Sequence, residues 1–235
     1  RRDEHGSRTY AIEDCTPNVL ELRDLLLAKS QYTLVKLSPM LDWRKAVADF
    51  DGTVREVHIV ATGNECKELL LVLGQQMHEE PSAPRVFCVN DNQRIDYDSA
   101  AYTQGLRIGG KPLPEVKNYL YEPNASIMKA GCFDLVEERF GVTQVGPSSH
   151  LFVSATPVAD FPGRGFAIEA IGGMNKKDIK RLLNGTKQAN IAVRNFPLTA
   201  PQLRKKLKLA DGGPVYLFGT TMQGCDHVLL RTSKI

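Results

Sequence analysis

The 235-residue sequence lacks the features that define several large classes of protein. Its longest apolar stretches, such as Leu69–Leu73, are far shorter than the ~20 residues that a membrane-spanning helix needs, which argues against a membrane protein. The five cysteines are scattered and never spaced C-x-x-C, which argues against a disulfide framework and a zinc site. These absences predict a soluble protein of a reducing cytoplasm, without a membrane partner and without a metal.

Short catalytic motifs are also missing. The sequence contains no H-E-x-x-H, P-loop, G-x-G-x-x-G or G-x-S-x-G motif. Its five histidines lie far apart, and we interpret each as a surface or core histidine. The opening residues, Arg1-Arg2-Asp3, include neither an initiator Met nor the apolar core of a signal peptide, which indicates a fragment of a longer protein.

The charge of the chain is distributed unevenly along its length. Residues 161–235 contain 13 Lys/Arg and 4 Asp/Glu, a net charge of +9, whereas the whole chain carries +3 and residues 1–160 therefore carry −6. A basic segment joined to an acidic one is typical of proteins that bind a polyanion, because Lys and Arg that neutralise phosphates release condensed counterions. A lysine face kept for solubility explains the same numbers, and charge alone does not decide between the two.

Hydrophobic periodicity predicts an α/β first half. We expect a helix from Pro17, capped by Thr16, to Lys29. The nearly all-apolar segment 31–37 predicts a strand covered on both faces. Helix, strand, helix, strand is the order of a parallel α/β sheet, and residues 65–73 remain ambiguous between helix and strand. The further elements expected here are a helix at 41–50 and strands at 54–61 and 85–89.

The second half has clearer local signals. We interpret 90–122 as a connection, followed by a helix that Asn124 caps and that presents Met128, Cys132, Leu135, Val136 and Phe140 on one face. Further on, Asn175 caps a helix to Leu183, and Thr199 with Gln202 forms a capping box. The strands expected around these helices are 142–145, 150–154, 166–171, 189–193, 215–220 and 227–231, so the basic tail has the order βαβαββ.

The two helices of the tail concentrate the positive charge. Their apolar residues share one face, which leaves the basic residues on the outer side. Only Phe196 and Tyr216 are aromatic residues outside the apparent core, which favours contacts to a nucleic-acid backbone over base stacking. The predicted nucleic-acid-binding residues are Lys176, Lys177, Lys180, Arg181, Lys187, Arg194, Arg204, Lys205, Lys206 and Lys208.

Polar residues follow the first buried strand. In open α/β sheets, ligands bind beyond the carboxyl ends of the strands, so Lys36, Ser38 and Asp42 are placed to contact a substrate. Ser38-Pro39 is also an ordinary strand terminator, which is the alternative interpretation.

Several longer motifs together resemble a bacterial family of class I S-adenosylmethionine-dependent methyltransferases with a small ferredoxin-like module and a THUMP-like domain at the C-terminus. The resemblance spans nearly the whole chain. The motifs that carry it are Asp14-Cys15-x-Pro17, Lys36-Leu-Ser-Pro-Met-Leu-Asp42, Glu56-Val-His-Ile-Val60, Asn64-Glu-Cys-Lys-Glu-Leu69, Glu122-Pro-Asn-Ala-Ser126, Asp160-Phe-Pro-Gly-Arg-Gly165 and Gln188-Ala-Asn-Ile-Ala-Val-Arg-Asn-Phe-Pro197.

The resemblance implies a fold and a division into domains. Residues 1–95 are expected to be the C-terminal half of a Rossmann-like methyltransferase sheet, with 96–120 as a linker. Residues 121–160 would form the ferredoxin-like module, and 161–235 the basic THUMP-like domain. The overall class is thus α/β and α+β.

The resemblance also implies a function. Arg1-Arg2-Asp3 would be the end of an Asp-Pro-x-Arg-Arg motif, and the Gly-rich cofactor loop would lie before the first residue of this chain. The fragment is therefore expected to be inactive and not to bind S-adenosylmethionine. No catalytic residue is assigned, and the candidates near the active site are Arg1, Arg2, Asp3, Lys36, Ser38, Pro39, Asp42, Glu65 and Lys67.

THUMP domains are associated with RNA, so the expected partner is tRNA or rRNA and the intact parent is expected to be an RNA methyltransferase. The alternative is a non-catalytic RNA-binding or assembly module on a methyltransferase-like scaffold. The incomplete sheet would also expose an edge strand, which predicts self-association.

Overall fold

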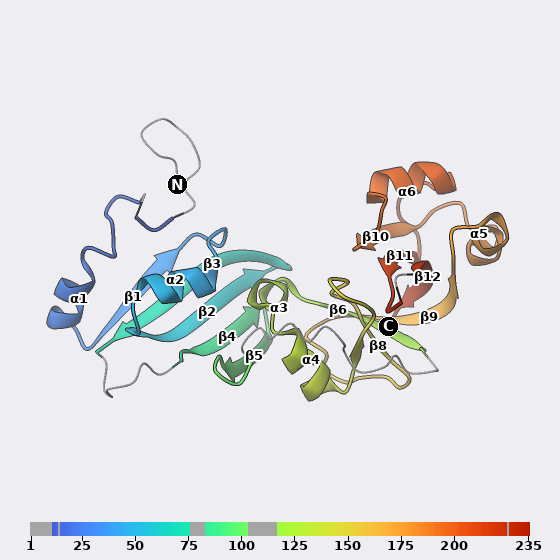
Figure 1. Ribbon diagram of the computed structural model, residues 1–235. Coiled ribbons are helices and arrows are strands. Elements are labelled where there is room, and N and C mark those ends of the chain that lie inside the picture. Colours follow the sequence, from blue (N-terminus) through green and yellow to red (C-terminus); the bar gives the residue numbers. More distant parts are fainter. Residues whose placement is uncertain (1–10, 14, 76–82, 103–116, 225) are drawn as a thin grey trace. The chain divides into compact units, whose positions relative to one another are not determined.

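The computed structural model describes residues 11–13, 15–75, 83–102, 117–224 and 226–235, and it contains two compact units (Figure 1). Unit 1 comprises the described residues up to 102 together with Asn124–Gly131. Unit 2 comprises the described residues of 117–123 and those from Cys132 onward. The domain boundaries expected at 95, 120 and 160 stay predictions, and most of the expected linker lies outside the described residues.

Unit 1 is built around a five-stranded sheet in the order β1-β3-β2-β4-β5. Its elements are α1 (Arg23–Lys29), β1 (Tyr32–Leu37), α2 (Trp43–Asp49), β2 (Val54–Thr62), β3 (Glu65–Gly74), β4 (Arg85–Asn90), β5 (Gln93–Asp98) and α3 (Ala125–Ala130). Within the described chain, β2 and β4 pair in parallel, whereas β1–β3, β2–β3 and β4–β5 pair antiparallel. The expectation of a parallel sheet is therefore wrong, and the sheet is mixed.

A tight turn explains the mixed pairing. Gly63 and Asn64 join β2 to β3 with φ values of 56° and 61°, and two successive left-handed residues are typical of two-residue hairpin turns. The ambiguous segment 65–73 is thus a strand, and it inserts antiparallel between β1 and β2. The connection expected from residue 90 also begins later than predicted, because β5 pairs with β4.

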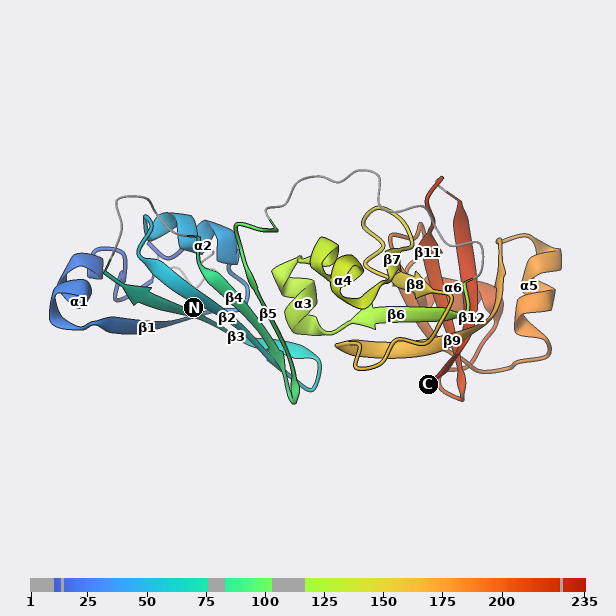
Figure 2. The same cartoon turned by 90° about the horizontal axis from the view of Figure 1, so that it is seen from below.

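Two of the described helices lie on one face of this sheet. Val57, Ile59 and Leu71 are fully buried, and α2 and α3 cover this face (Figure 2). On the edge strand β1, Tyr32 and Leu34 are 60% and 62% exposed, whereas Val35 and Leu37 are buried. The expectation that this strand is covered on both faces is therefore wrong, because its side chains alternate between the core and an exposed face.

Two expected helices differ from the prediction. The first begins at Arg23, because Leu20 N donates to Asn18 Oδ1 at 3.1 Å and organises residues 18–22 as turns. The helix expected from Asn124 to Phe140 is two helices, since Gly131 ends α3 with a φ of 67° and α4 (Phe133–Phe140) starts after Cys132. The cap by Asn124 is confirmed, because its Oδ1 accepts from Ser126 N and Ile127 N.

Unit 2 is a seven-stranded sheet in the order β10-β11-β12-β9-β6-β8-β7. Besides α4, its elements are β6 (Tyr119–Pro123), β7 (Thr143–Gln144), β8 (Phe152–Ser154), β9 (Gly163–Gly172), α5 (Lys176–Leu183), β10 (Asn190–Arg194), α6 (Ala200–Leu207), β11 (Val215–Thr221) and β12 (His227–Lys234). From β9 onward the order is βαβαββ, as predicted. The mixed α/β fold class is confirmed.

The sheet of unit 2 separates two hydrophobic clusters. Helices α5 and α6 pack on one face through Leu182, Leu203 and Leu207. The opposite face carries a cluster that includes Phe166 and Phe218. Both helix starts agree with the sequence, because Asn175 caps α5 and the Thr199–Gln202 capping box starts α6.

Candidate nucleic-acid interface

Seven of the ten predicted basic residues are exposed lysines on or beside α5 and α6. Leu182 on α5, and Leu203 and Leu207 on α6, turn inward at helical spacing, so the lysines of both helices face outward. The structure gives these lysine side chains no ion pair with another described residue. They are Lys176, Lys177, Lys180, Lys187, Lys205, Lys206 and Lys208.

Arg204 differs from these lysines. Its Nη1 donates to Ala189 O and to Ala210 O, both at 2.9 Å, and its Nη2 lies 2.6 Å from Asp211 Oδ1. The side chain is 25% exposed. The expectation that Arg204 projects outward is wrong, because the guanidinium turns back to satisfy two backbone carbonyls.

Arg181 is also used within the fold. Its Nη2 donates to Ile171 O at 2.7 Å, and the same atom lies 3.2 Å from Asp178 Oδ1. Asp178 in turn accepts from Gly173 N at 2.9 Å, and this bond is the largest of the causes that lower the pKa of its carboxyl. The helix start and the β9 end are therefore joined by one polar network.

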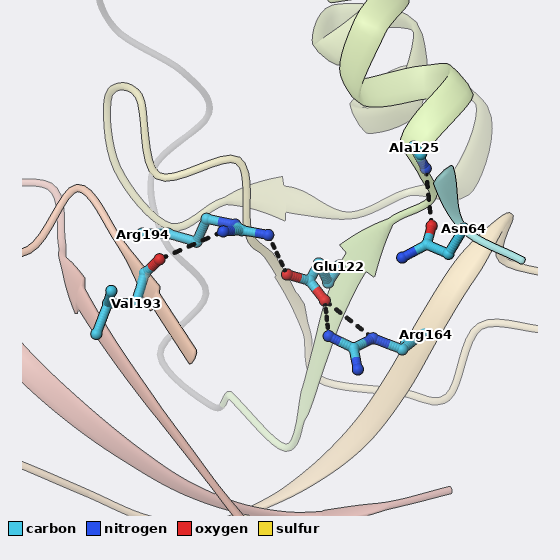
Figure 3. Close-up of polar contacts among 6 residues, drawn as sticks. All are labelled: Asn64, Glu122, Ala125, Arg164, Val193 and Arg194. Carbon is cyan, nitrogen blue, oxygen red and sulfur yellow. Dashed lines mark hydrogen bonds and ion pairs between the residues drawn. The ribbon is translucent and has the colours of Figure 1, made fainter. Parts of the chain in front are cut away.

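Glu122 is a buried carboxylate held by two arginines (Figure 3). Its Oε2 accepts from Arg164 Nε at 3.0 Å and also from Arg164 Nη2, and its Oε1 accepts from Arg194 Nη2 at 2.8 Å. The carboxylate is 4% exposed, whereas the two arginine side chains are 42% and 40% exposed. One carboxylate balances two guanidiniums, so the cluster keeps one positive charge.

Sequence reasoning did not single out Arg164. Its only signal was the motif Asp160–Gly165, which belongs to the resemblance and not to the charge argument. The structure pairs Arg164 directly with Glu122 across β9 and β6. Periodicity cannot predict this contact, because the two residues are 42 positions apart.

His150 lies close enough to Arg194 for the charge of that arginine to affect its pKa. Its ring stacks on Phe133 with centroids 4.6 Å apart. Burial lowers the pKa of His150, and the positive charge of Arg194 lowers it further. Both causes favour the neutral imidazole.

The two aromatic residues that were expected outside the core are packed against it. Phe196 lies against the cluster under α5 and α6, close enough to Gly219 that a Cβ there would come within 3.1 Å of its ring. Tyr216 packs on the opposite face, with its ring centroid 5.1 Å from that of Phe166. Both side chains are half-buried, so neither ring is fully open to a base.

In unit 1, the candidates near the active site gather at one end of the sheet but have local partners. Lys36 Nζ lies 2.8 Å from Glu68 Oε1, and Glu65 and Lys67 pair with each other. Ser38 Oγ accepts from Met40 N at 3.3 Å, in the turn that also contains Pro39. Arg1, Arg2 and Asp3 lie outside the described residues.

Asp42 caps α2. Its Oδ1 accepts from Arg44 N at 2.8 Å and from Lys45 N at 3.0 Å. The bond from the Lys45 amide is the largest cause that lowers the pKa of the Asp42 carboxyl. This cap accounts for Asp42 structurally, and no observation places Asp42 or its neighbours against a substrate, so their proposed roles stay predictions.

Four of the five cysteines lie among the described residues. Cys15, Cys66, Cys88 and Cys132 are not in disulfides. No group of three or more His, Cys, Asp or Glu side chains among the described residues is arranged to hold a metal ion. In the described ranges, no helix is both long and apolar enough to cross a membrane.

Two family models match the chain. Residues 119–162 match the model of a ferredoxin-like domain, and residues 163–234 match the model of a THUMP domain-like family. No curated protein matches the chain. The ferredoxin-like and THUMP-like domains expected from the resemblance are thereby confirmed.

A solved structure is similar to nearly the whole chain. It is described as a putative methyltransferase from Porphyromonas gingivalis W83, with 34% sequence identity and a TM-score of 0.85. The match covers 97% of this chain and 57% of that one. The chain is therefore similar in fold to a putative methyltransferase, spans little more than half of its length, and carries a ferredoxin-like and a THUMP-like domain.

Proposed function

We propose that this chain is the C-terminal portion of a cytoplasmic, S-adenosylmethionine-dependent methyltransferase that acts on RNA, either tRNA or rRNA. The observation that carries the proposal is the combination of a putative methyltransferase as structural neighbour with a THUMP-like domain that exposes seven lysines on or beside its two helices. In this proposal unit 2 holds the RNA backbone. Unit 1 contributes part of the methyltransferase fold.

The described residues of unit 1 do not by themselves provide a site that fits S-adenosylmethionine. At the carboxyl ends of β1 and β2, Asp42 is occupied as a helix cap and Glu68 by Lys36. A cavity of about 810 Å³ lies instead at the amino ends of β1, β2 and β4, where Tyr32, Glu56 and Arg85 line it. We therefore propose that the groups holding the cofactor belong to a longer protein.

The residues of this chain are then expected to act by positioning. Methyl transfer requires the acceptor atom to be held in line with the methyl group, and this alignment supplies much of the rate enhancement. Lysines that hold the RNA backbone place the acceptor without taking part in bond formation. Their loss should raise KM more than it lowers kcat.

Methyl transfer to RNA by the longer protein tests the proposal. We expect labelled methyl from S-adenosylmethionine to appear in RNA from a strain that lacks the gene and not in RNA from its parent, whose sites are already modified. Calorimetry on the longer protein should show S-adenosylmethionine binding, and on residues 1–235 it should show none. RNA binding without cofactor binding by the longer protein would contradict the enzyme and favour the non-catalytic RNA-binding module.

A further inference from the structure

Among the described residues of unit 2, no Phe, Tyr or Trp side chain is exposed. The exposed large hydrophobic residues among those that the structure describes are Leu25, Tyr32, Leu34, Met40 and Ile235, and of these only Ile235 lies in unit 2. The exposed ring of His227 is held edge-to-face on Phe196, and its Nδ1 is hydrogen-bonded to Thr221 Oγ1. Unpaired bases are bound mainly by stacking on aromatic rings, so unit 2 lacks the usual means of holding a single strand.

Five described arginines of unit 2 are also engaged in contacts within the fold. Guanidinium groups can stack on bases and donate two parallel hydrogen bonds to a base edge, which an ammonium group cannot. Each of the following arginines donates to a carboxylate or a backbone carbonyl of unit 2: Arg164, Arg181, Arg194, Arg204 and Arg231. The cations left without an ion pair in the described part of the helical face are lysines, which interact with phosphates as point charges.

The seven lysines lie on or beside two helices that pack on the same sheet. Both α5 and α6 pack through their apolar residues against one hydrophobic cluster on the same face of the sheet, and Figure 1 shows both helices next to its strands. The two carboxylates on or beside the same helices, Asp178 and Asp211, are paired with Arg181 and Arg204. We call the side chains of Lys176, Lys177, Lys180, Lys187, Lys205, Lys206 and Lys208 the lysine surface.

We propose that the lysine surface binds double-helical RNA through its phosphates and does not read bases. Double-stranded RNA is recognised mostly by its shape and its backbone, because its deep major groove is closed to side chains. A surface with free ammonium groups and without free stacking groups suits that ligand and not an unpaired strand. The inference rests on the proposed function, since it names the class of RNA held by the same surface.

Fluorescence anisotropy with the full 235-residue chain tests this inference. The probes are a labelled RNA duplex of about 20 base pairs, each of its two single strands, and a duplex of scrambled sequence. We expect the duplex to bind about tenfold or more tightly than either strand, and the scrambled duplex to bind equally well. The logarithm of the affinity should fall linearly with the logarithm of the salt concentration.

Matched variants locate the surface. The double variants Lys177→Gln/Lys180→Gln and Lys205→Gln/Lys206→Gln should each reduce the salt slope by about 1.8, because each lost duplex phosphate contact contributes about 0.9. The control Lys29→Gln/Lys45→Gln removes the same two charges from unit 1 and should leave the slope unchanged. An equal reduction of the salt slope in the control would show that net charge, and not the lysine surface, controls binding.

The outcomes separate this inference from the proposed function. Tighter binding of single strands would overturn the inference and leave an RNA-binding protein in place. A marked preference between the two duplex sequences would overturn the absence of base reading. No binding of any RNA at low salt would overturn both the inference and the RNA substrate of the proposed methyltransferase.

Discussion

Arg194 Nη2 donates to Glu122 Oε1 at 2.8 Å and so connects the ends of β10 and β6. Three strands, β11, β12 and β9, lie between β10 and β6 in the sheet order. Strand pairing therefore does not bring the two residues together, and their contact is an additional constraint on the sheet. Arg164 shares the same carboxylate from the neighbouring strand β9.

Replacement of Glu122 should destabilise unit 2. Glu122→Gln keeps the size of the side chain but leaves two guanidiniums without their carboxylate, at an expected cost of about 1–3 kcal/mol. The cost stays below that of a fully buried charge, because water reaches both arginines. Hydrogen exchange of the β6, β9 and β10 amides measures this loss of stability. Glu169→Gln is the control, because the Glu169 carboxylate that pairs with Arg231 is 40% exposed, and equal loss of protection in both variants would contradict the prediction.

Replacement of Arg204 should mainly lower stability, whereas replacement of Lys205 should mainly weaken RNA binding. Arg204→Ala removes the donor to Ala189 O and Ala210 O and should lower the local stability by about 1–3 kcal/mol. Lys205→Ala should change stability by about 0.5 kcal/mol or less but weaken RNA binding. Exchange of the Ala189 and Ala210 amides reports on the first effect and anisotropy on the second. Weaker RNA binding by Arg204→Ala with unchanged exchange would show that Arg204 is a phosphate contact after all.

Variants of Asp42 test whether its carboxylate serves only as a helix cap or also has a chemical role. Asp42→Ala should destabilise α2 by about 0.5–2 kcal/mol, whereas Asp42→Asn should retain most of the cap, because Asn is an equally good N-cap. Trp43, the single tryptophan of the chain, reports on this helix by fluorescence. If the longer protein loses methyl transfer in Asp42→Asn while the fluorescence transition is unchanged, the carboxylate has a chemical role beyond the cap.

The same carboxylate predicts a dependence on pH. The pKa of Asp42 is lower in the folded protein than its ordinary value of 3.8, so its ionised form stabilises the fold. That contribution is complete well above pH 3.8 and is lost as the pH falls through the folded pKa. Asp42→Asn should remove this part of the acid sensitivity of the Trp43 signal.

His150 should make unit 2 less stable in mild acid. Its pKa lies below the ordinary 6.5 in the folded state, so the unfolded chain binds the proton more readily. The neutral ring therefore contributes stability that is present above pH 6.5 and is lost as the pH falls from 6.5 through the folded pKa. His150→Asn suits the positive φ of 53° and should flatten the profile of hydrogen exchange against pH in this range. An unchanged profile would assign the titration to another group.

The edge strand β1 is expected to mediate self-association. It has no neighbour on its outer side in the described sheet, and it exposes Tyr32 and Leu34. Unpaired strand edges with apolar side chains template pairing with another chain. Leu34→Glu should therefore shift the sedimentation of concentrated protein toward the monomer, whereas Leu25→Glu on the exposed side of α1 should have a smaller effect. A chain that is monomeric at all concentrations would contradict this prediction.

Local signals in the sequence were sufficient for much of unit 2. The cap at Asn175 and the capping box at Thr199 are formed within a few residues, so their helices start where the sequence predicts. The same is true of the order βαβαββ and of the outward lysines, because helical periodicity alone separates the apolar face from the charged face. Cap residues and periodicity act over less than two turns, and a sequence displays them directly.

Contacts between distant residues required the tertiary structure. Nothing local indicates that β3 inserts antiparallel between β1 and β2, or that Arg204 turns back to two carbonyls while Lys205 stays free. Glu122 and Arg194 are 72 positions apart, so the periodicity of the sequence does not indicate their contact either. Sequence determined which residues are charged and which helices carry them. Only the fold decided which charges are already paired, because pairing depends on the positions of acceptors that the chain brings together from afar.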